Sequence, residues 1–432
     1  MRYEFDEYSL LTSERLLLKG GERVALKPKV FETLLALVRN PGRLLSKEEL
    51  IGLIWPDSFV EVSNLSQNIF TLRRALGESP QDHRFIVTVP GYGYRFVAKV
   101  RELEEGEGPR RKTPKDVDVY QTYVKGRFFW DKRTEEGLRV ALSSARAVLE
   151  AEPGLPLGHV ALADCYLLMG EFLYLSPGEA FPPAREAARR ALALDPALGE
   201  AHASMAEYVF FYGRDWAGAE RFYRDAIRLS PDYAGARHWY TWFLIAMGRY
   251  EDAAEQIRQA QMIDPGSLVL NTIVGLPDYY TGRYEQAIKQ FRGTLEIEPN
   301  YHHARYYLGS ALVHAGRPEE AVAEFEAMVA ADPLQQAIAL LGYCYAVSGR
   351  REEAGRMLSR LDELERQRFV AAYVRAFIHI GLGERERALD QLERAYEEQE
   401  LWLVFLNVDP FFRGLRDEPR FTRLLERLRF KG

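Results

Sequence analysis

The segment SNLSQNIFTLRRALG, residues 63–77, carries polar side chains of only a few chemical types. Four aliphatic residues recur in it at helical spacing: Leu65, Ile69, Leu72 and Leu76. This spacing predicts a helix with one buried face. The other positions hold amides, hydroxyls and guanidinium groups, which can hydrogen-bond to base edges and phosphates in a major groove. These candidate contact residues are Asn64, Ser66, Gln67, Asn68, Thr71, Arg73 and Arg74.

A second candidate surface follows this helix. The sequence FIVTVPGYGYRFVA, residues 85–98, predicts two strands joined by a glycine-rich turn. Thr88 and Arg95 lie on the strands, and Tyr92 lies at the turn. A hairpin beside a groove-reading helix can follow the neighbouring minor groove or the phosphate backbone, so we expect these three side chains to contact nucleic acid.

Three further elements must position the helix and the hairpin. Residues 3–26 alternate between apolar and polar around a Gly-Gly turn, which predicts short antiparallel strands. One helix is predicted from Pro28, and a second follows the capping box formed by Ser46 and Glu49. The expected order is therefore a sheet, three helices and a hairpin.

This order resembles the winged helix-turn-helix domain of OmpR/PhoB-type response regulators. The resemblance covers nearly all of residues 3–98 and rests on three separated motifs, NPGRLLSKEELIGLIWPDS, NLSQNIFTLRRALGE and FIVTVPGYGYRF. It implies that residues 1–100 form a DNA-binding domain whose partner is double-stranded DNA. We expect no receiver domain before the first strand, which is the arrangement of one-component regulators with an N-terminal DNA-binding domain.

The resemblance also assigns roles within the domain. It implies that residues 63–76 are the recognition helix, in which Asn68 and Thr71 face the groove, and that residues 88–95 are the wing. Arg73 and Arg74 match the basic pair of the family, although Arg73 in a structural ion pair is an alternative. Pro90 stands where the wing often carries arginine, which is a departure from the family pattern.

A different pattern occupies the rest of the chain. Prolines recur there at spacings of 43, 35, 34, 34 and 34 residues. A period of about 34 residues fits two helices and two tight turns, in which a glycine ends the first helix, an alanine marks a close helix crossing and a proline ends the second helix. The glycine and alanine markers in phase are Gly213, Gly248, Gly282, Gly316, Gly349, Gly383, Ala219, Ala253, Ala287, Ala321, Ala354 and Ala388.

This period resembles the tetratricopeptide repeat (TPR). We expect a charged linker at residues 101–117, about eight repeats over residues 118–400, and C-terminal capping helices over residues 401–432 that close the end of the stack. The predicted fold class is mostly α: a small α+β winged helix-turn-helix domain followed by an α-solenoid, the TPR superhelix.

The inner helices of a TPR superhelix line a concave groove. A groove of this kind suits a protein, a peptide or a small effector, and the repeats could also mediate a homodimer. The candidate groove residues are mostly aromatic: Tyr208, Phe211, Tyr212, His238, Trp242, Tyr279, Tyr280, His303, Tyr306 and Tyr343. The alternative is that these side chains form the core between helices.

Composition limits the remaining functions. The chain has a net charge of −6, but residues 1–100 hold 14 Lys and Arg against 12 Asp and Glu, a net +2. The two cysteines lack a partner motif, no stretch approaches the length of a membrane helix, and no catalytic, metal or cofactor motif is present. We therefore expect a cytoplasmic protein that is not an enzyme and needs no cofactor or metal.

The combined reading is a DNA-binding transcriptional regulator. Its N-terminal winged helix is expected to read promoter DNA, and its repeats are expected to bind an effector or partner or to self-associate. The alternative is a TPR interaction scaffold whose winged helix docks protein and not DNA. The polar and basic character of the recognition-helix face favours the regulator.

Overall fold

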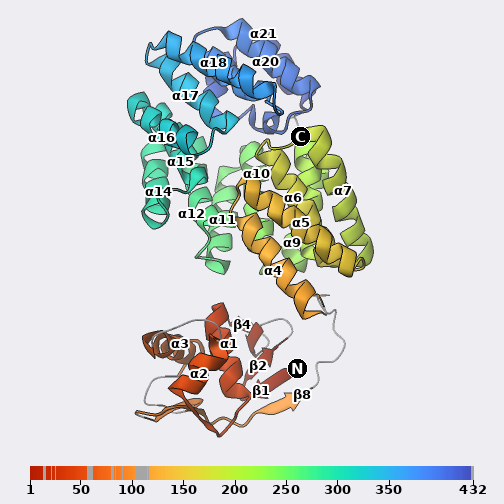
Figure 1. Cartoon of the computed structure of the whole chain (residues 1–432), viewed down its shortest axis with the longest axis vertical. Coiled ribbons are helices and arrows are strands. Elements are labelled where there is room, and N and C mark those ends of the chain that lie inside the picture. Colours follow the sequence, from red (N-terminus) through yellow and green to blue (C-terminus); the bar gives the residue numbers. More distant parts are fainter. Residues whose placement is uncertain are drawn as a thin grey trace. The chain divides into compact units, whose positions relative to one another are not determined.

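The chain divides into two compact units, Met1–Arg111 and Lys112–Gly432 (Figure 1). The computed structural model describes residues 1–12, 16–20, 22–24, 26–55, 62–78, 82, 84–89, 91–103, 114 and 116–429. No helix among these residues is both long and apolar enough to span a bilayer.

The first unit begins with an antiparallel sheet of order β4-β3-β2-β1-β8. Its strands are β1 Arg2–Phe5, β2 Tyr8–Leu11, β3 Leu16–Lys19, β4 Glu22–Val24 and β8 Arg101–Leu103. The linker was predicted to begin at residue 101, but Arg101–Leu103 form the strand β8 of the first unit. This strand pairs with β1, which would otherwise be an edge strand with unpaired backbone groups, and the Tyr3 hydroxyl donates to Glu102 at 3.3 Å.

Three helices and a second sheet complete this unit. The helices are α1 Pro28–Val38, α2 Lys47–Ile54 and α3 Val62–Ala75, and the sheet has the order β5-β7-β6, with β5 Leu44–Ser46, β6 Ile86–Val89 and β7 Gly93–Phe96. The predicted capping box starts α2: Glu49 N donates to Ser46 Oγ at 3.1 Å, and Ser46 N donates to Glu49 Oε2 at 2.9 Å. The predicted order of sheet, helices and hairpin is confirmed.

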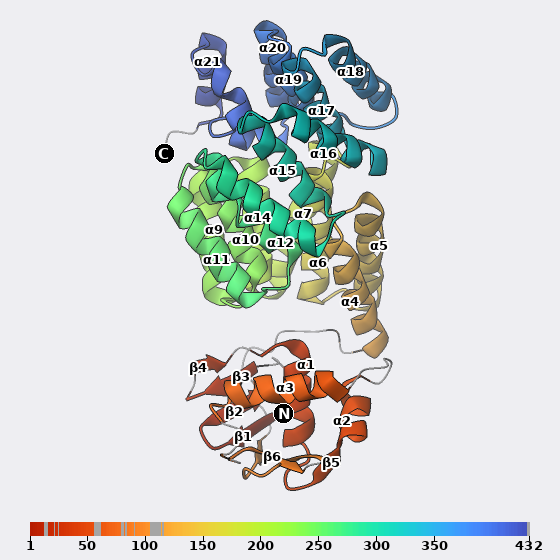
Figure 2. The same ribbon diagram turned by 90° about the vertical axis from the view of Figure 1, so that its left-hand side faces the viewer.

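The second unit is built of helix pairs stacked along the chain (Figure 2). Eight pairs lie within the described residues, and each packs on the next. They are α4 Val117–Asp131 with α5 Glu135–Ala151, α6 Pro156–Glu171 with α7 Pro177–Leu194, α8 Gly199–Tyr208 and η1 Val209–Gly213 with α9 Trp216–Leu229, α10 Ala234–Ala246 with α11 Tyr250–Ile263, α12 Leu268–Ile273 and α13 Leu276–Tyr280 with α14 Tyr284–Ile297, α15 His302–His314 with α16 Pro318–Ala331, α17 Gln335–Val347 with α18 Arg351–Glu365, and α19 Ala372–Gly381 with α20 Arg385–Glu397.

The marker residues have the expected physical roles, with one exception. All six marker alanines are 0% exposed, as expected for close helix crossings. Five marker glycines have positive φ, but Gly213 does not. It ends the π-helical turn η1, and the left-handed position moves to Arg214, whose φ is 52°. The extra residue of a π turn shifts the register by one, which explains the displacement.

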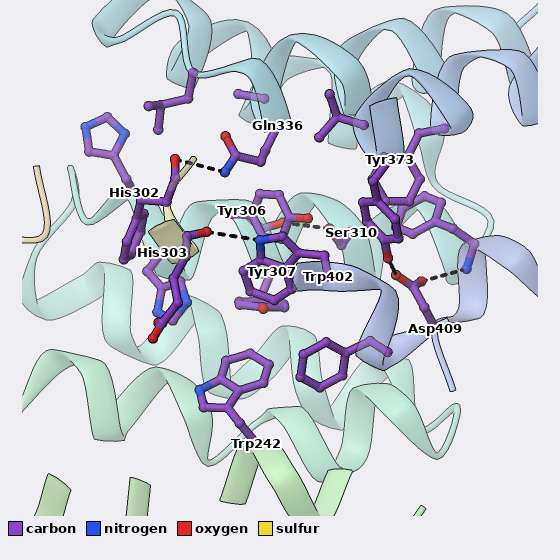
Figure 3. A pocket seen from close by; sticks show the side chains of 18 of the residues that line it. Trp242, His302, His303, Tyr306, Tyr307, Ser310, Gln336, Tyr373, Trp402 and Asp409 are labelled. Carbon is purple, nitrogen blue, oxygen red and sulfur yellow. Dashed lines mark hydrogen bonds between the residues drawn. The ribbon is translucent and has the colours of Figure 1, made fainter. Parts of the chain in front are cut away.

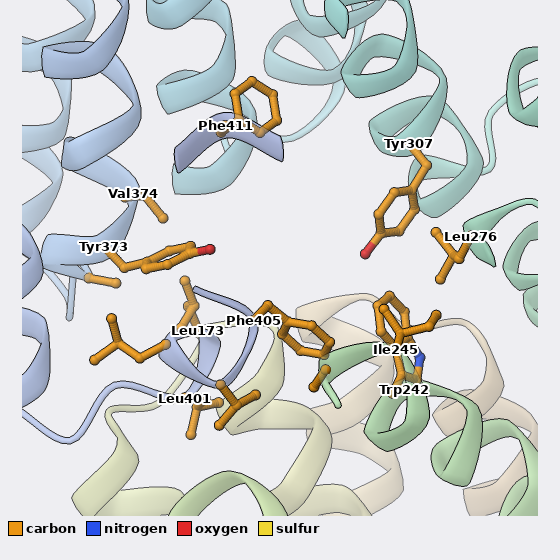
Figure 4. Packing of buried hydrophobic residues seen from close by; sticks show 14 of the residues in the cluster. Leu173, Trp242, Ile245, Leu276, Tyr307, Tyr373, Val374, Leu401, Phe405 and Phe411 are labelled. Carbon is orange, nitrogen blue, oxygen red and sulfur yellow. The ribbon is translucent and has the colours of Figure 1, made fainter. Parts of the chain in front are cut away.

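The C-terminal segment differs from the predicted cap. It forms two 3-10 turns, η2 Leu401–Phe405 and η3 Pro410–Leu415, and the helix α21 Pro419–Arg427. The helix α21 packs on α20 as a cap would, whereas η2 packs on α6, η1 and α10 as well as on α20, and η3 packs on α19. Figure 4 shows Phe405 of this segment beside Trp242 of the repeats. We call residues 400–415 the tail segment. It lies inside the superhelix because its side chains are too apolar to remain on a surface.

The tail segment and the turn after α6 connect repeats that are distant in sequence. Trp402 Nε1 donates to the carbonyl oxygen of Glu171 at 3.0 Å, across 231 residues. Gln335 Nε2 and Gln336 Nε2 donate to the carbonyl oxygens of Leu173 and Phe172, at 3.2 and 3.3 Å. The second repeat therefore contacts both the seventh repeat and the tail segment, so contacts in this array are not limited to neighbouring repeats.

Candidate nucleic-acid interface and repeat cavity

The exposed side of α3 carries a stripe of three side chains one helical turn apart. Leu65, Ile69 and Leu72 are at most 2% exposed and fix the opposite side of the helix in the core. Gln67, Phe70 and Arg74 are therefore directed outward, and Phe70 is 59% exposed. Asn64 and Ser66 are also exposed. Phe70 is not among the predicted contact residues, because only polar side chains were considered. Its spacing from Gln67 and Arg74 places it on the same side of the helix.

Asn68 has a different role from the predicted groove contact. Its Nδ2 donates to the carbonyl oxygen of Lys29 at 3.2 Å and to Thr33 Oγ1 at 3.1 Å, and both acceptors lie on α1. The Thr71 hydroxyl donates to the carbonyl oxygen of Gln67 at 2.8 Å. The amide nitrogen of Asn68 thus joins α3 to α1, because the half-buried side chain points along the helix pair and not away from it.

Arg73 also acts within the domain. Its guanidinium donates to the carbonyl oxygen of Ile86 at 2.8 Å and to Thr88 Oγ1 at 3.0 Å. Arg73 therefore has a structural role, but its partners are neutral oxygen atoms and not the acidic group of the ion pair that was the alternative. Thr88 is half-buried and serves as that acceptor, so Arg73 and Thr88 fix the wing against α3 and are not the exposed contacts that were predicted.

The end of the wing is exposed. Tyr92 is 70% exposed, and Arg95 is exposed between the buried Tyr94 and Phe96. Gly93 must be glycine, because an added Cβ would lie 1.9 Å from the carbonyl oxygen of Leu45 on β5. Pro90 lies outside the described residues. We define the interface face as the exposed side chains of α3 and the wing: Asn64, Ser66, Gln67, Phe70, Arg74, Tyr92 and Arg95.

The second candidate site is a cavity of about 110 Å³ inside the repeats (Figure 3). Helices from successive repeats and the tail segment line it. Among the predicted groove residues, those that line the cavity are Phe211, His238, Trp242, Tyr279, Tyr280, His303 and Tyr306.

Three predicted groove residues do not reach the cavity. Tyr212 stacks on Phe181 with ring centroids 5.4 Å apart and an interplanar angle of 4°, and Tyr208 lies 5.8 Å from Tyr212. Tyr343 packs edge-on against Phe411 of the tail segment at 4.9 Å. These rings belong to the core between helices, which is the alternative that the sequence left open.

Trp242 is buried beneath the tail segment. Its ring lies 5.5 Å from Phe405 at 77°, 6.3 Å from Trp402 at 81°, and 5.9 Å from Tyr307. Only 7% of Trp242 is exposed. The continuous aromatic strip expected to hold an extended peptide is thus covered at Trp242 by the chain's own tail, and a partly open cavity remains.

Polar groups interrupt the aromatic lining on two sides. Near α15 and α17 lie His302, His303 and Gln336, and Figure 3 shows these side chains on one side of the cavity. On the other side Asp409 accepts hydrogen bonds from the Tyr373 hydroxyl at 2.9 Å and from Phe411 N at 3.0 Å. Four lining atoms are buried without a hydrogen-bond partner among the described groups: Glu171 Oε1, His302 Nδ1, His303 Nδ1 and Gln336 Oε1.

Burial changes the protonation of this lining. It raises the pKa of Glu171 to about 7 and the pKa of Asp409 to about 6, because a carboxylate loses hydration inside the protein. It lowers the pKa of His303 to about 3, with help from the charge of Arg133. His303 is therefore neutral at physiological pH. In the part of the chain that the structure describes, no three His, Cys, Asp or Glu side chains meet as metal ligands would.

Known protein families match both units. Residues 21–96 match the family described as "Transcriptional regulatory protein, C terminal". Two families of tetratricopeptide repeats match residues 278–335 and residues 210–271 and 313–376. The chain joins a transcriptional-regulator DNA-binding domain of the OmpR/PhoB type to tetratricopeptide repeats. The interface face belongs to the first of these domains, and the cavity belongs to the repeats.

Two curated relatives match about a fifth of this chain. The transcriptional regulator HilA of Salmonella typhi is 35% identical over 95 residues, which are 22% of this chain and 17% of HilA. The transcriptional regulatory protein CutR of Streptomyces coelicolor is 39% identical over 85 residues, which are 19% of this chain and 37% of CutR. The chain therefore spans well under half the length of these relatives.

The helical array has a likeness among solved structures. The structure of a human IFIT1 dimer with m7Gppp-AAAA has a TM-score of 0.52 and 16% identity, and it covers 84% of this chain and 77% of the IFIT1 chain. At this level of identity the likeness concerns the fold. The prediction of a winged helix followed by a TPR solenoid is confirmed.

Proposed function

We propose that this protein is a transcriptional regulator that binds double-stranded DNA through the interface face and receives a regulatory signal through its repeats. The observation that carries the proposal is the exposed stripe of Gln67, Phe70 and Arg74 beside Tyr92 and Arg95, in a domain matched by a regulator family. We propose that it acts without catalysis and, because its target is DNA, in the cytoplasm.

Each exposed side chain suits a particular contact. The Gln67 amide can pair with adenine in the major groove, and the Phe70 ring can pack on a thymine methyl group. Arg74 and Arg95 suit phosphate oxygens. Neither arginine forms an ion pair with an acidic residue that the structure describes, whereas Arg2, Lys19, Arg43 and Arg84 do. The interface face therefore carries two positive charges that no described acidic residue neutralises.

The proposal is tested with the full chain. Duplexes selected from a random pool should share a sequence, and binding should weaken steeply as salt concentration rises. Gln67→Ala should cost about 1–3 kcal/mol on the selected site and relax preference at one position. Arg74→Ala should weaken binding to all sequences and lower the salt slope by about 1.

Arg39→Ala is the matched control, because Arg39 is an exposed arginine at the C-terminal end of α1, outside the interface face. It should leave both the sequence preference and the salt slope unchanged. A folded full-length chain that bound no duplex in a salt-dependent way would contradict the proposal and favour the alternative, a winged helix that docks protein.

A further inference from the structure

The repeat cavity combines aromatic rings with acidic groups. Trp242 and Tyr306 from the repeats and Trp402 and Phe405 from the tail segment line it, together with other rings of α13, α15 and α19. Glu171 and Asp409 line the same space. Rings of this kind carry negative charge on their faces, so a cavity of rings and carboxylates attracts positive charge.

The carboxyl groups of the cavity lack a cationic partner. Neither Glu171 nor Asp409 has a Lys, Arg or His nitrogen within ion-pair distance among the described side chains, and Glu171 Oε1 accepts no hydrogen bond there. Arg133 is the one Lys or Arg on the described lining, and its guanidinium lies over the Trp130 ring, 4.4 Å from the centroid. The charge of Arg133 acts on Glu171 and that of Arg416 acts on Asp409, but neither carboxyl group has the ion-paired cation that buried carboxylates normally have.

A second buried carboxyl group lies beside Glu171. This group is Glu207, and the Tyr223 hydroxyl is 2.5 Å from Glu207 Oε1. Burial, with the charge of Glu171, keeps the pKa of Glu207 well above its ordinary value. Two buried carboxyl groups therefore lie next to each other at the edge of the cavity, and the charge of one raises the pKa of the other.

We infer that the cavity binds a small organic cation, whose ammonium centre is held by the rings of Trp242, Trp402 and Phe405 and balanced by the carboxylates of Glu171 and Asp409. The role of this cation as the effector of the repeats rests on the proposed regulatory function. His302 Nδ1, His303 Nδ1 and Gln336 Oε1 are free to hydrogen-bond polar substituents of the same ligand.

Other ligand classes fit the lining less well. An anion would meet two carboxyl groups and only one guanidinium group. A purely apolar ligand would leave the buried polar atoms of Glu171 and Gln336 without partners, at a cost in binding free energy. An extended peptide has no open path along the rings, because the tail segment covers Trp242.

The position of the tail segment gives such a ligand a regulatory effect. Trp402, Phe405 and Asp409 come from the tail segment, whereas Trp242 and Glu171 come from the repeats. A ligand that contacts both parts stabilises the state in which the tail segment is seated. The repeats should therefore melt at a higher temperature in its presence.

Choline and its uncharged isostere 3,3-dimethylbutan-1-ol are the primary probes, and tetraethylammonium is a bulkier cation. Binding to the full chain is followed by tryptophan fluorescence and by the melting temperature of the repeats. At least one of the two cations should bind and raise the melting temperature, and choline should bind about tenfold or more tightly than its isostere. Equal binding of the isostere, tighter binding of benzoate, or no binding of either cation at millimolar concentration would overturn the inference.

Charge-removing variants locate the site. Glu171→Gln and Asp409→Asn keep the size of each side chain and should each weaken binding of the cation about tenfold. Glu200→Gln is the matched control, because Glu200 is a buried carboxyl group bonded to Ser230 outside the cavity lining, and it should leave the affinity unchanged. Unchanged affinity in both Glu171→Gln and Asp409→Asn would contradict the site.

These measurements contain no DNA. A chain that binds the cation but no duplex would retain the cavity and lose the proposed regulator, whereas a chain that binds duplex but neither cation would retain the regulator and lose this inference.

Discussion

The DNA-binding domain and the repeats place their candidate functional side chains in opposite environments. On α3, Gln67 and Arg74 are exposed. In the repeats, Trp242 was expected to face an open groove but is 7% exposed. In both cases, helical spacing predicts which face of a helix points away from the helices nearest to it in sequence. It does not identify what covers that side, because the cover of Trp242 comes from Trp402 and Phe405, more than a hundred residues later.

The largest test of this contrast is Trp242→Ala. If the tail segment makes Trp242 part of the core, the substitution should cost the repeats about 3–5 kcal/mol and lower their melting temperature sharply. Calorimetry of the full chain measures this. Phe128→Ala is the control, because Phe128 is 59% exposed, and it should change stability by no more than about 0.5 kcal/mol. An unchanged melting temperature for Trp242→Ala, together with loss of the regulatory response, would instead favour the open groove.

Ala321→Trp tests whether the two units are energetically independent. Ala321 is 0% exposed at a helix crossing, so the larger ring should overpack it at a cost of about 1–3 kcal/mol or more. The loss should appear in the melting of the repeats and leave the transition of the first unit in place. Circular dichroism together with proteolysis can follow both transitions, and a joint shift would mean that the units share one core.

A buried histidine makes stability in acid differ between the units. Burial lowers the pKa of His314 to about 3, and the charge of Arg413 acts in the same direction. The unfolded chain takes up this proton near pH 6.5, whereas the folded chain does not. The contribution of His314 is therefore full above that pH and is lost as the pH falls toward 3, by up to about 1.4 kcal/mol for each pH unit.

Buried carboxyl groups act in the opposite direction over part of this range. The raised pKa values of Glu400 and Asp409, about 7 and about 6, add stability as the pH falls. The comparison with His314→Phe removes their effect, because both proteins keep these carboxyl groups. The variant should lose less stability than the wild type between pH 6.5 and pH 4, measured by chemical unfolding at each pH. Parallel pH curves would show that His314 is not the group responsible.

The smallest expected effect separates Asn68 from Gln67. Because the Asn68 amide is bonded to α1, Asn68→Ala should lower the stability of the first unit by about 1 kcal/mol and leave the preferred DNA sequence intact. Gln67→Ala should change the preferred DNA sequence and leave the stability of the first unit intact. Selection of bound duplexes and melting of each variant compare the two. A changed preference in Asn68→Ala would return this residue to the groove.

Short-range patterns predicted most of the fold. The capping box of Ser46 and Glu49 and the six buried marker alanines depend on neighbours within one or two helices, so their signals lie in the local sequence. The predictions that were wrong depend on distant partners. The strand Arg101–Leu103 pairs with the first strand of the chain, and Arg73 is held by the hairpin. No local spacing carries that information.

The candidate sites divide along the same line. The exposed positions of α3 could be read from spacing, and Phe70 could have been included by the same rule. The cavity could not be assembled from sequence, because Glu171, Trp242 and Asp409 lie on three separate parts of the chain. The apolar run LWLVFLNVDPFF, residues 401–412, was the available signal, since a run of this composition is unlike an exposed cap.

The bond between Trp402 and Glu171 also has a consequence for protein synthesis. The two residues are 231 positions apart, so the second repeat leaves the ribosome long before its partner exists. During that interval the inner rings, Trp242 among them, have no cover and expose an apolar surface that favours aggregation or chaperone binding. Closing so long a loop is also slow, because the entropy of closure is lost before the contacts form. A nascent chain halted at Gln399 would therefore keep this surface exposed, and synthesis of the tail segment would be the step that allows it to be covered.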